Sequence, residues 1–121
     1  MINLEALNVY QTYVEAWKPI ADAQRKSILS EVFEENMEYL VPEYVGGANS
    51  AVEDMERFQK QYPGAHFAIE NVSTHHEVAL FKWVLILPDG KVTVKGHDCI
   101  RFSPDGKIVS LLTFGPAFPK S

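Results

Sequence analysis

Two Pro-Asp-Gly tripeptides, at 88–90 and 104–106, divide the C-terminal half of the sequence into long apolar segments. Proline fixes its own φ and glycine tolerates positive φ, so each tripeptide is typical of a reverse turn between antiparallel strands. The segments beside them, 77–87, 91–102 and 107–114, are rich in β-branched and aromatic residues. The sequence therefore predicts a meander of three long antiparallel strands, which a further strand over 66–73 precedes.

Helical periodicity marks the N-terminal part of the chain. Over residues 4–18, apolar side chains such as Tyr10 and Val14 recur at steps of three and four residues. A second helix is predicted over 22–34, with Asp22 as its capping residue, because apolar residues again recur on one face. Two antiparallel helices are therefore expected at the start of the domain.

A short strand and a third helix are predicted between these helices and the meander. Residues 37–41 alternate in polarity and stop at Pro42, and the glycine pair that follows indicates a loop. The run from Ser50 to Glu53 has the pattern of a capping box, and the apolar stripe behind it continues until Pro63. This pattern predicts a helix that begins at about Ser50.

The order of helix, helix, strand, helix and then long strands predicts an α+β fold, with three N-terminal helices packed on one face of a curved antiparallel sheet. A chain of 121 residues fits one domain, which we place at 1–121. The segment ALFKWVLIL is apolar on both faces, so the outer face of the sheet should also be covered. A homodimer packed sheet to sheet would cover it.

Composition argues against several classes of partner. The formal net charge of −5 and the lack of a basic cluster argue against nucleic acid, and no apolar run approaches the roughly 20 residues that a membrane span needs. The single cysteine, Cys99, can form neither an internal disulfide nor a multi-thiolate zinc site. We therefore expect a cytoplasmic protein.

Asp98 is the first candidate for chemistry. It shares a strand face with the apolar residues Val94, Ile100 and Phe102, so its carboxyl group should lie among apolar side chains and its pKa should rise. A raised pKa suits a hydrogen-bond donor to a carbonyl group or a general acid/base near neutral pH. The alternative is an acid that is held by Tyr13 or by a backbone group for structure alone.

The four histidines are weaker candidates. His75 and His76 are predicted to open the long strand, where neighbouring side chains point to opposite faces and cannot share one metal. Alternation also places His97 opposite Asp98, and His66 follows a turn. Because the histidines lack the spacing of a metal site, we predict neither a metal nor another cofactor.

Four aromatic residues and one threonine are candidates for the walls of an apolar pocket, because they occupy the inward register of their helices and strands. The alternative is that each simply fills the core. The predicted wall residues are Trp17, Tyr39, Phe58, Trp83 and Thr113.

An ordered set of segments resembles the bacterial nuclear transport factor 2-like proteins of the SnoaL-like group. These segments include NMEYLVP, QYPGAHF, HHEVALFKW, GHDCIRFSPDGKI and the closing TFGPAFP. The resemblance implies a cystatin-like cone with an apolar pocket between the helices and the sheet. Most members of the group have no assigned reaction, and a minority are isomerases, cyclases, dehydratases or epoxide hydrolases that act on apolar compounds.

The resemblance extends distantly to ketosteroid isomerase, in which a protonated carboxylic acid lies beside a tyrosine in an apolar site. It assigns the acid to Asp98 and the oxyanion-binding tyrosine to Tyr13. The proton-shuttling aspartate of that enzyme precedes a proline, and Val41 stands in its place before Pro42. Val41 therefore belongs to the predicted pocket wall but cannot act as a base.

The expected function is the binding of a small hydrophobic carbonyl compound by Asp98 and Tyr13, with an isomerase or lyase step. Two alternatives are a binding module without turnover, which the absence of a base at Val41 favours, and a protein-interaction module with a vestigial pocket.

Overall fold

The computed structural model describes residues 3–115, and the end of the segment TFGPAFP lies outside them. The described chain contains three helices and six strands. The helices are α1 (Asn3–Glu15), α2 (Asp22–Val32) and α3 (Ala48–Gln61). The strands are β1 (Phe33–Val41), β2 (Tyr44–Gly46), β3 (His66–His75), β4 (Val78–Ile86), β5 (Val92–Phe102) and β6 (Ile108–Phe114).

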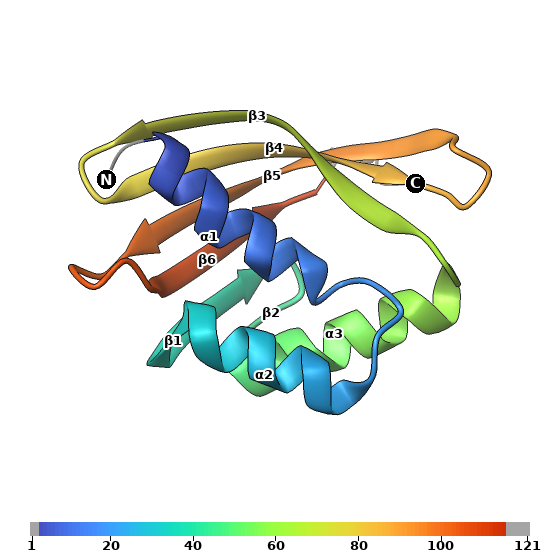
Figure 1. Cartoon of the computed structure of the whole chain (residues 1–121), viewed down its shortest axis with the longest axis horizontal. Coiled ribbons are helices and arrows are strands. Elements are labelled where there is room, and N and C mark those ends of the chain that lie inside the picture. Colours follow the sequence, from blue (N-terminus) through green and yellow to red (C-terminus); the bar gives the residue numbers. More distant parts are fainter. Residues whose placement is uncertain (1–2, 116–121) are drawn as a thin grey trace.

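The six strands form one sheet in the order β2-β1-β6-β5-β4-β3. Figure 1 shows the three helices gathered on one side of this curved sheet, with α1 running across the strands, so the predicted α+β class is confirmed. The sheet is mixed and not wholly antiparallel, because β1 pairs with β6 in parallel. Sequence patterns gave no sign of this pairing, since α3 and the whole meander separate the two strands.

The two Pro-Asp-Gly turns are confirmed. Gly90 and Gly106 adopt φ values of 88° and 81°, which glycine reaches without steric cost. The amide of Gly90 donates to the carbonyl of Leu87 at 2.8 Å, and the amide of Gly106 donates to that of Ser103 at 2.9 Å. The predicted meander therefore forms, and β3 extends it to four antiparallel strands.

Several predicted boundaries were wrong by a few residues. The first helix ends at Glu15, so Trp17 lies on the turn behind it. The second helix ends at Val32 and not at 34, because Phe33 is buried and pairs with Ile108 as the first residue of β1. The segment after Pro42 forms the short strand β2 before the loop.

Neither predicted helix cap forms as expected. Asp22 is the first residue of α2 and pairs with Arg25 at 2.7 Å, while Ala21 occupies the capping position. Arg25 is buried and also donates to the carbonyl oxygen of Ala16 at 2.8 Å, which ties the α1–α2 connection together. The third helix begins at Ala48, so Ser50 lies inside its first turn.

The histidine pair also lies elsewhere than predicted. His75 ends β3, and His76 begins the hairpin turn to β4 with a φ of 53°. Because the turn reverses the chain, the two rings approach each other, with 3.2 Å between their Nδ1 atoms. The pair therefore closes a hairpin and does not open the long strand.

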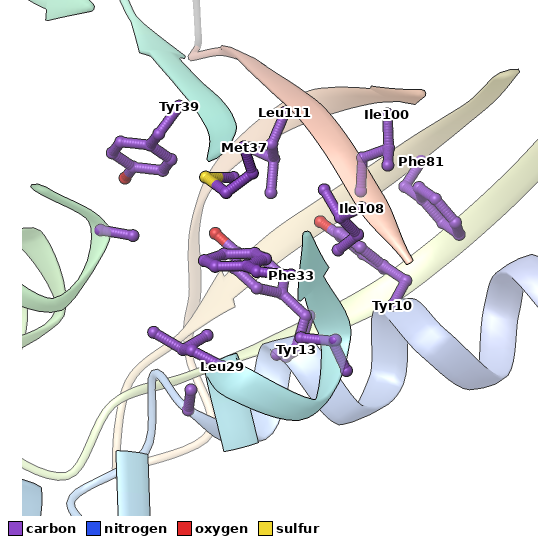
Figure 2. Close-up of a cluster of buried hydrophobic side chains, with 14 of the residues drawn as sticks. Tyr10, Tyr13, Leu29, Phe33, Met37, Tyr39, Phe81, Ile100, Ile108 and Leu111 are labelled. Atoms are coloured by element: carbon purple, nitrogen blue, oxygen red, sulfur yellow. The ribbon is translucent and has the colours of Figure 1, made fainter. Parts of the chain in front are cut away.

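The core lies between the helices and the concave face of the sheet. Figure 2 shows Tyr10 and Tyr13 projecting from α1 into this core, among side chains from β1, β4, β5 and β6. The rings of Tyr10 and Phe81 stack with their centroids 3.9 Å apart. The largest fully buried side chains are Tyr10, Tyr13, Tyr39, Met55, Phe81, Ile100, Ile108 and Leu111. Within residues 3–115, no helix is both long enough and apolar enough to cross a membrane.

Candidate functional site

A cavity of about 820 Å³ lies between the helices and the sheet. It falls in the range of small-molecule sites, which is roughly 300–1,000 Å³. All eight residues that the sequence predicted for the site border this cavity, and their roles in binding stay predictions. These residues are Tyr13, Trp17, Tyr39, Val41, Phe58, Trp83, Asp98 and Thr113.

The buried carboxyl group of Asp98 and the exposed Arg57 both border the cavity, and we call the Asp98 end inner and the Arg57 end outer. Asp98 is 5% exposed and sits in the middle of β5, on the face that strand alternation predicted. The hydroxyl of Tyr10 donates to its Oδ2 at 2.6 Å, and Nε1 of Trp83 donates to its Oδ1 at 3.2 Å. Asp98 is therefore a buried acid with side-chain donors on both oxygens.

Burial raises the pKa of Asp98 to about 6, because the charged form loses its hydration. Hydrogen bonds from Tyr10, Thr113 and Trp83 favour the carboxylate and offset part of this rise in pKa. A pKa close to neutral pH leaves both protonation states accessible, as a general acid/base requires.

The position of Trp83 depends on Gly96. Trp83 and Gly96 are direct partners on β4 and β5, and a Cβ atom at Gly96 would lie 2.2 Å from Cζ2 of the indole. The missing side chain therefore leaves room for the indole, which reaches Asp98 two residues along the strand. This close approach gives a physical reason for a glycine at position 96.

Tyr10, which the sequence analysis did not place in the site, is the tyrosine that binds Asp98. Tyr13 was the predicted partner, and it lies beside Tyr10 with 5.7 Å between the ring centroids. Burial raises the pKa of Tyr13 well above its ordinary value, and the nearby Asp98 adds to this effect. Tyr10 and Tyr13 are three residues apart on one helix face, and only the structure reveals which phenol reaches the acid.

An aromatic cluster forms one wall of the cavity. The ring of Phe67 on β3 stacks on Phe58 at 4.8 Å between centroids and meets the edges of Trp17 at 5.4 Å and Trp83 at 5.1 Å. Trp17 also packs edge-on against Phe58. Phe67 was not among the predicted wall residues, although its strand was predicted. The cluster offers flat apolar surface to a ligand.

A second polar group borders the cavity between β1 and α3. The hydroxyl of Tyr39 donates to Oδ2 of Asp54 at 2.8 Å, and Nη2 of Arg57 donates to Oδ1 of the same carboxylate. Sequence reasoning did not find Asp54 or Arg57, because charged residues three apart on a helix usually form a solvated face. Val41 lies two residues beyond Tyr39 and brings only an aliphatic side chain to this wall.

The other candidate residues do not line the cavity. His97 is exposed on the opposite face of β5, as predicted, and His66 begins β3. Cys99 is half-buried on the outer face of the sheet. Among residues 3–115, no three His, Cys, Asp or Glu side chains lie close enough together to hold a metal ion.

Residues 10–111 match the family model of the SnoaL-like domain. The match covers the C-terminal part of α1, every element from α2 to β5 and part of β6, and it includes both Tyr10 and Asp98. No curated protein matches the sequence.

Solved structures share the fold over nearly the whole chain. A candidate isomerase of the SnoaL-like family from Agrobacterium tumefaciens is 25% identical, with a TM-score of 0.83 over 94% of this chain and 99% of that one. A protein of unknown function with a cystatin-like fold from Methylobium petroleophilum has a TM-score of 0.76 at 15% identity, over 100% of this chain and 81% of that one. A candidate SnoaL-like polyketide cyclase from Jannaschia sp. CCS1 has a TM-score of 0.73 at 14% identity, over 94% and 87%.

Proposed function

The chain belongs to the SnoaL-like domain family, and from that premise we propose that its cavity binds a small hydrophobic molecule that carries a carbonyl group. Asp98 and Tyr13 are the polar groups that meet this carbonyl, and the aromatic cluster holds the apolar part. Asp98 then serves as acid/base in an isomerase or lyase step that needs no cofactor.

One observation carries the proposal: an acid with a pKa of about 6 lies at the inner end of a cavity large enough for a ligand. A carboxyl group that only supported the fold would need no cavity beside it. Strongly perturbed acids in clefts are typical of functional sites. The structural relatives named as a candidate isomerase and a candidate cyclase agree with this class of chemistry.

The chemical step follows from the protonation states of Asp98. As a carboxylate, Asp98 takes a proton from the carbon next to the ligand carbonyl, and the electron pair of the C–H bond moves into the carbonyl group. The phenol of Tyr13 donates a hydrogen bond to the oxygen, which gains negative charge. Return of the proton to another carbon gives an isomer, and loss of a leaving group gives a lyase product.

A binding module without turnover is the second candidate, and a specific observation favours it. Both oxygens of Asp98 accept hydrogen bonds from neighbouring side chains, and Val41 supplies no second base. An interaction module with a vestigial pocket is disfavoured, because the cavity beside Asp98 is open.

Two apolar probes separate these candidates. Phenylnaphthylamine, a neutral dye that fluoresces in apolar sites, should bind to both an enzyme and a binding module. Nitrobenzisoxazole, whose ring opens when a base removes its C–H proton and the N–O bond breaks, should react only if Asp98 acts as a base. We expect an opening rate that rises with pH through about 6 and is lost in Asp98→Asn.

The outcomes are distinct. Dye binding without ring opening would leave the binding module as the function. Absence of dye binding would overturn the proposal for both candidates. The Tyr13→Phe variant should bind the dye with unchanged affinity, because the dye has no carbonyl oxygen to accept a hydrogen bond from the phenol.

We further propose that the protein is a homodimer that packs through the outer face of the sheet. An apolar row crosses five strands there through direct strand partners. Its members are Leu80, Cys99, Leu112, Leu40 and Val45. Such a row is costly to expose to water, and a second copy would cover it.

Analytical ultracentrifugation tests this assembly. Leu80 is 45% exposed in the row, and Leu80→Arg should give a monomer. Val92, which is 49% exposed outside the row, provides the control, and Val92→Arg should stay dimeric. A monomeric unmodified protein would contradict the proposal.

A further inference from the structure

The outer end of the cavity contains a guanidinium group that the proposed carbonyl chemistry does not use. Arg57 lies on α3 and borders the cavity together with Asp54 and Gln61. Its side chain is 61% exposed, so its cationic head is accessible to a bound molecule and to solvent. This end of the cavity is thus chemically different from the apolar wall and from the Asp98 end.

Contacts within the protein already neutralise the carboxylate of Asp54. Its Oδ2 accepts a hydrogen bond from Tyr39 and its Oδ1 accepts one from Arg57. Asp54 is 18% exposed and lies on the inner side of α3. Asp54 therefore holds the guanidinium in place, and Arg57 balances the charge of its carboxylate.

The guanidinium retains donors for a ligand. Arginine carries five N–H groups in a planar fork, and the contact with Asp54 is made through Nη2. A guanidinium that is fixed in advance loses less entropy when it binds a second partner, and its fork matches the two oxygens of a carboxylate. Gln61, one helical turn further along α3, can add an amide donor on the same side.

We propose that the ligand carries an anionic group, of which a carboxylate fits best, and that this group binds Arg57 at the outer end of the cavity. The apolar body of the ligand then lies on the aromatic cluster, and its carbonyl group faces Asp98. This inference rests on the proposed function and names the ligand class as hydrophobic oxo acids.

Glu43 acts against an anion at this end. It lies on the exposed turn between β1 and β2 and also borders the cavity. Solvent and salt screen its charge, whereas a ligand anion in contact with Arg57 forms charge-assisted hydrogen bonds. Arg57 should therefore strengthen the binding of an anion and Glu43 should weaken it. Substitutions at the two positions should change the affinity for an anion in opposite directions.

A matched pair of dyes measures this effect without knowledge of the ligand. Anilinonaphthalene sulfonate and phenylnaphthylamine share one ring system, and only the former carries an anionic group. Titration at neutral pH gives both affinities, and competition between the two dyes shows that they share the cavity. The variants are Arg57→Gln and Glu43→Gln, with Lys60→Gln as a control at an exposed cation on the same helix.

We expect Arg57→Gln to weaken binding of the sulfonate dye by about three- to tenfold, which is less than the loss of a buried charge-assisted contact because Arg57 is largely exposed. Glu43→Gln should strengthen it by a smaller factor, and Lys60→Gln should leave it within about twofold. None of the three variants should alter binding of phenylnaphthylamine. Arg57→Lys should restore part of the affinity, since it keeps the charge but loses the fork.

Failure of this inference differs from failure of the proposed function. If phenylnaphthylamine does not bind, the proposed ligand-binding function is wrong. If it binds, and the sulfonate dye loses no affinity in Arg57→Gln, the cavity is real but Arg57 is not an anion site.

Discussion

The two aspartates that border the cavity hold their positions by different means. Asp98 is 5% exposed and rests on neutral donors, the hydroxyl of Tyr10 and the indole N–H of Trp83. Asp54 is 18% exposed and rests on the cation Arg57 together with Tyr39. Uncharged hydrogen-bond donors around a buried carboxyl group leave it able to gain or lose a proton near neutral pH. A cationic partner instead balances the negative charge of a carboxylate.

The two aspartates also differ in the role that we propose for each. In the proposed function, the inner acid moves a proton and the outer acid positions a guanidinium. Burial and the charge of the neighbouring groups are the differences on which these two proposed roles rest. The following experiments test this contrast at each end of the cavity.

The pH dependence of stability should give the largest effect. The folded state raises the pKa of Asp98 from an ordinary value of 3.8 to about 6, so the folded protein keeps a proton that the unfolded chain has lost between these values. The stabilisation is therefore complete below about pH 4 and is lost as the pH rises through about 6. At about 1.4 kcal/mol for each pH unit, the loss amounts to about 3 kcal/mol.

Urea unfolding of the unmodified protein and of Asp98→Asn across this pH range measures the effect. The difference between their free energies of unfolding should change by about 3 kcal/mol between about pH 4 and pH 7, since the asparagine cannot titrate. Parallel curves would show that the folded state does not raise the pKa of Asp98.

Tyr10→Phe should give the next largest effect. It removes the donor from Oδ2 of Asp98 and leaves a buried carboxylate with less hydrogen bonding, at a cost of about 1–3 kcal/mol above pH 7. The cost should shrink near pH 5, where the carboxyl group is protonated, and the pKa of Asp98 should rise further. Carboxyl carbon NMR shifts report the pKa, and Tyr13→Phe is the control that keeps the Tyr10 hydrogen bond.

Tyr39→Phe at the outer end should have the smallest effect, about 1 kcal/mol or less in the free energy of unfolding. Arg57 still contacts Asp54 in this variant, and water can replace the lost phenol because Asp54 is partly exposed. Urea unfolding at neutral pH provides the measurement. A loss as large as that of Tyr10→Phe would mean that the two aspartates depend equally on their tyrosines.

The inner end of the cavity was largely predictable from the sequence. Strand alternation alone placed Asp98 on a buried face, and the turn residues fixed the strands beside it. The choice between Tyr10 and Tyr13 was not predictable, because residues three apart on a helix share a face and differ only in which strand they meet. The resemblance favoured Tyr13, and the structure gives the hydrogen bond to Tyr10.

The charged pair at the outer end was not visible in the sequence patterns, although Tyr39 and Val41 beside it were predicted as wall residues. Asp54 and Arg57 form an intrahelical pair that most often faces solvent, and only the position of α3 over β1 brings the pair to the cavity. The parallel pairing of β1 with β6 was missed for a similar reason, since pairing between distant strands leaves no local signature. In this chain, local periodicity is enough to predict the position of Asp98, whereas the position of the charged pair on α3 depends on tertiary packing.

The parallel pairing of β1 and β6 has a kinetic consequence. Phe33 pairs with Ile108 and Leu40 with Leu112, so β1 cannot pair with β6 until residues 108–114 have left the ribosome. Closing so long a loop is entropically costly, and folds dominated by distant contacts form slowly. We expect the meander to fold first and the β1 wall to close last, which makes completion of the cavity the late step in folding.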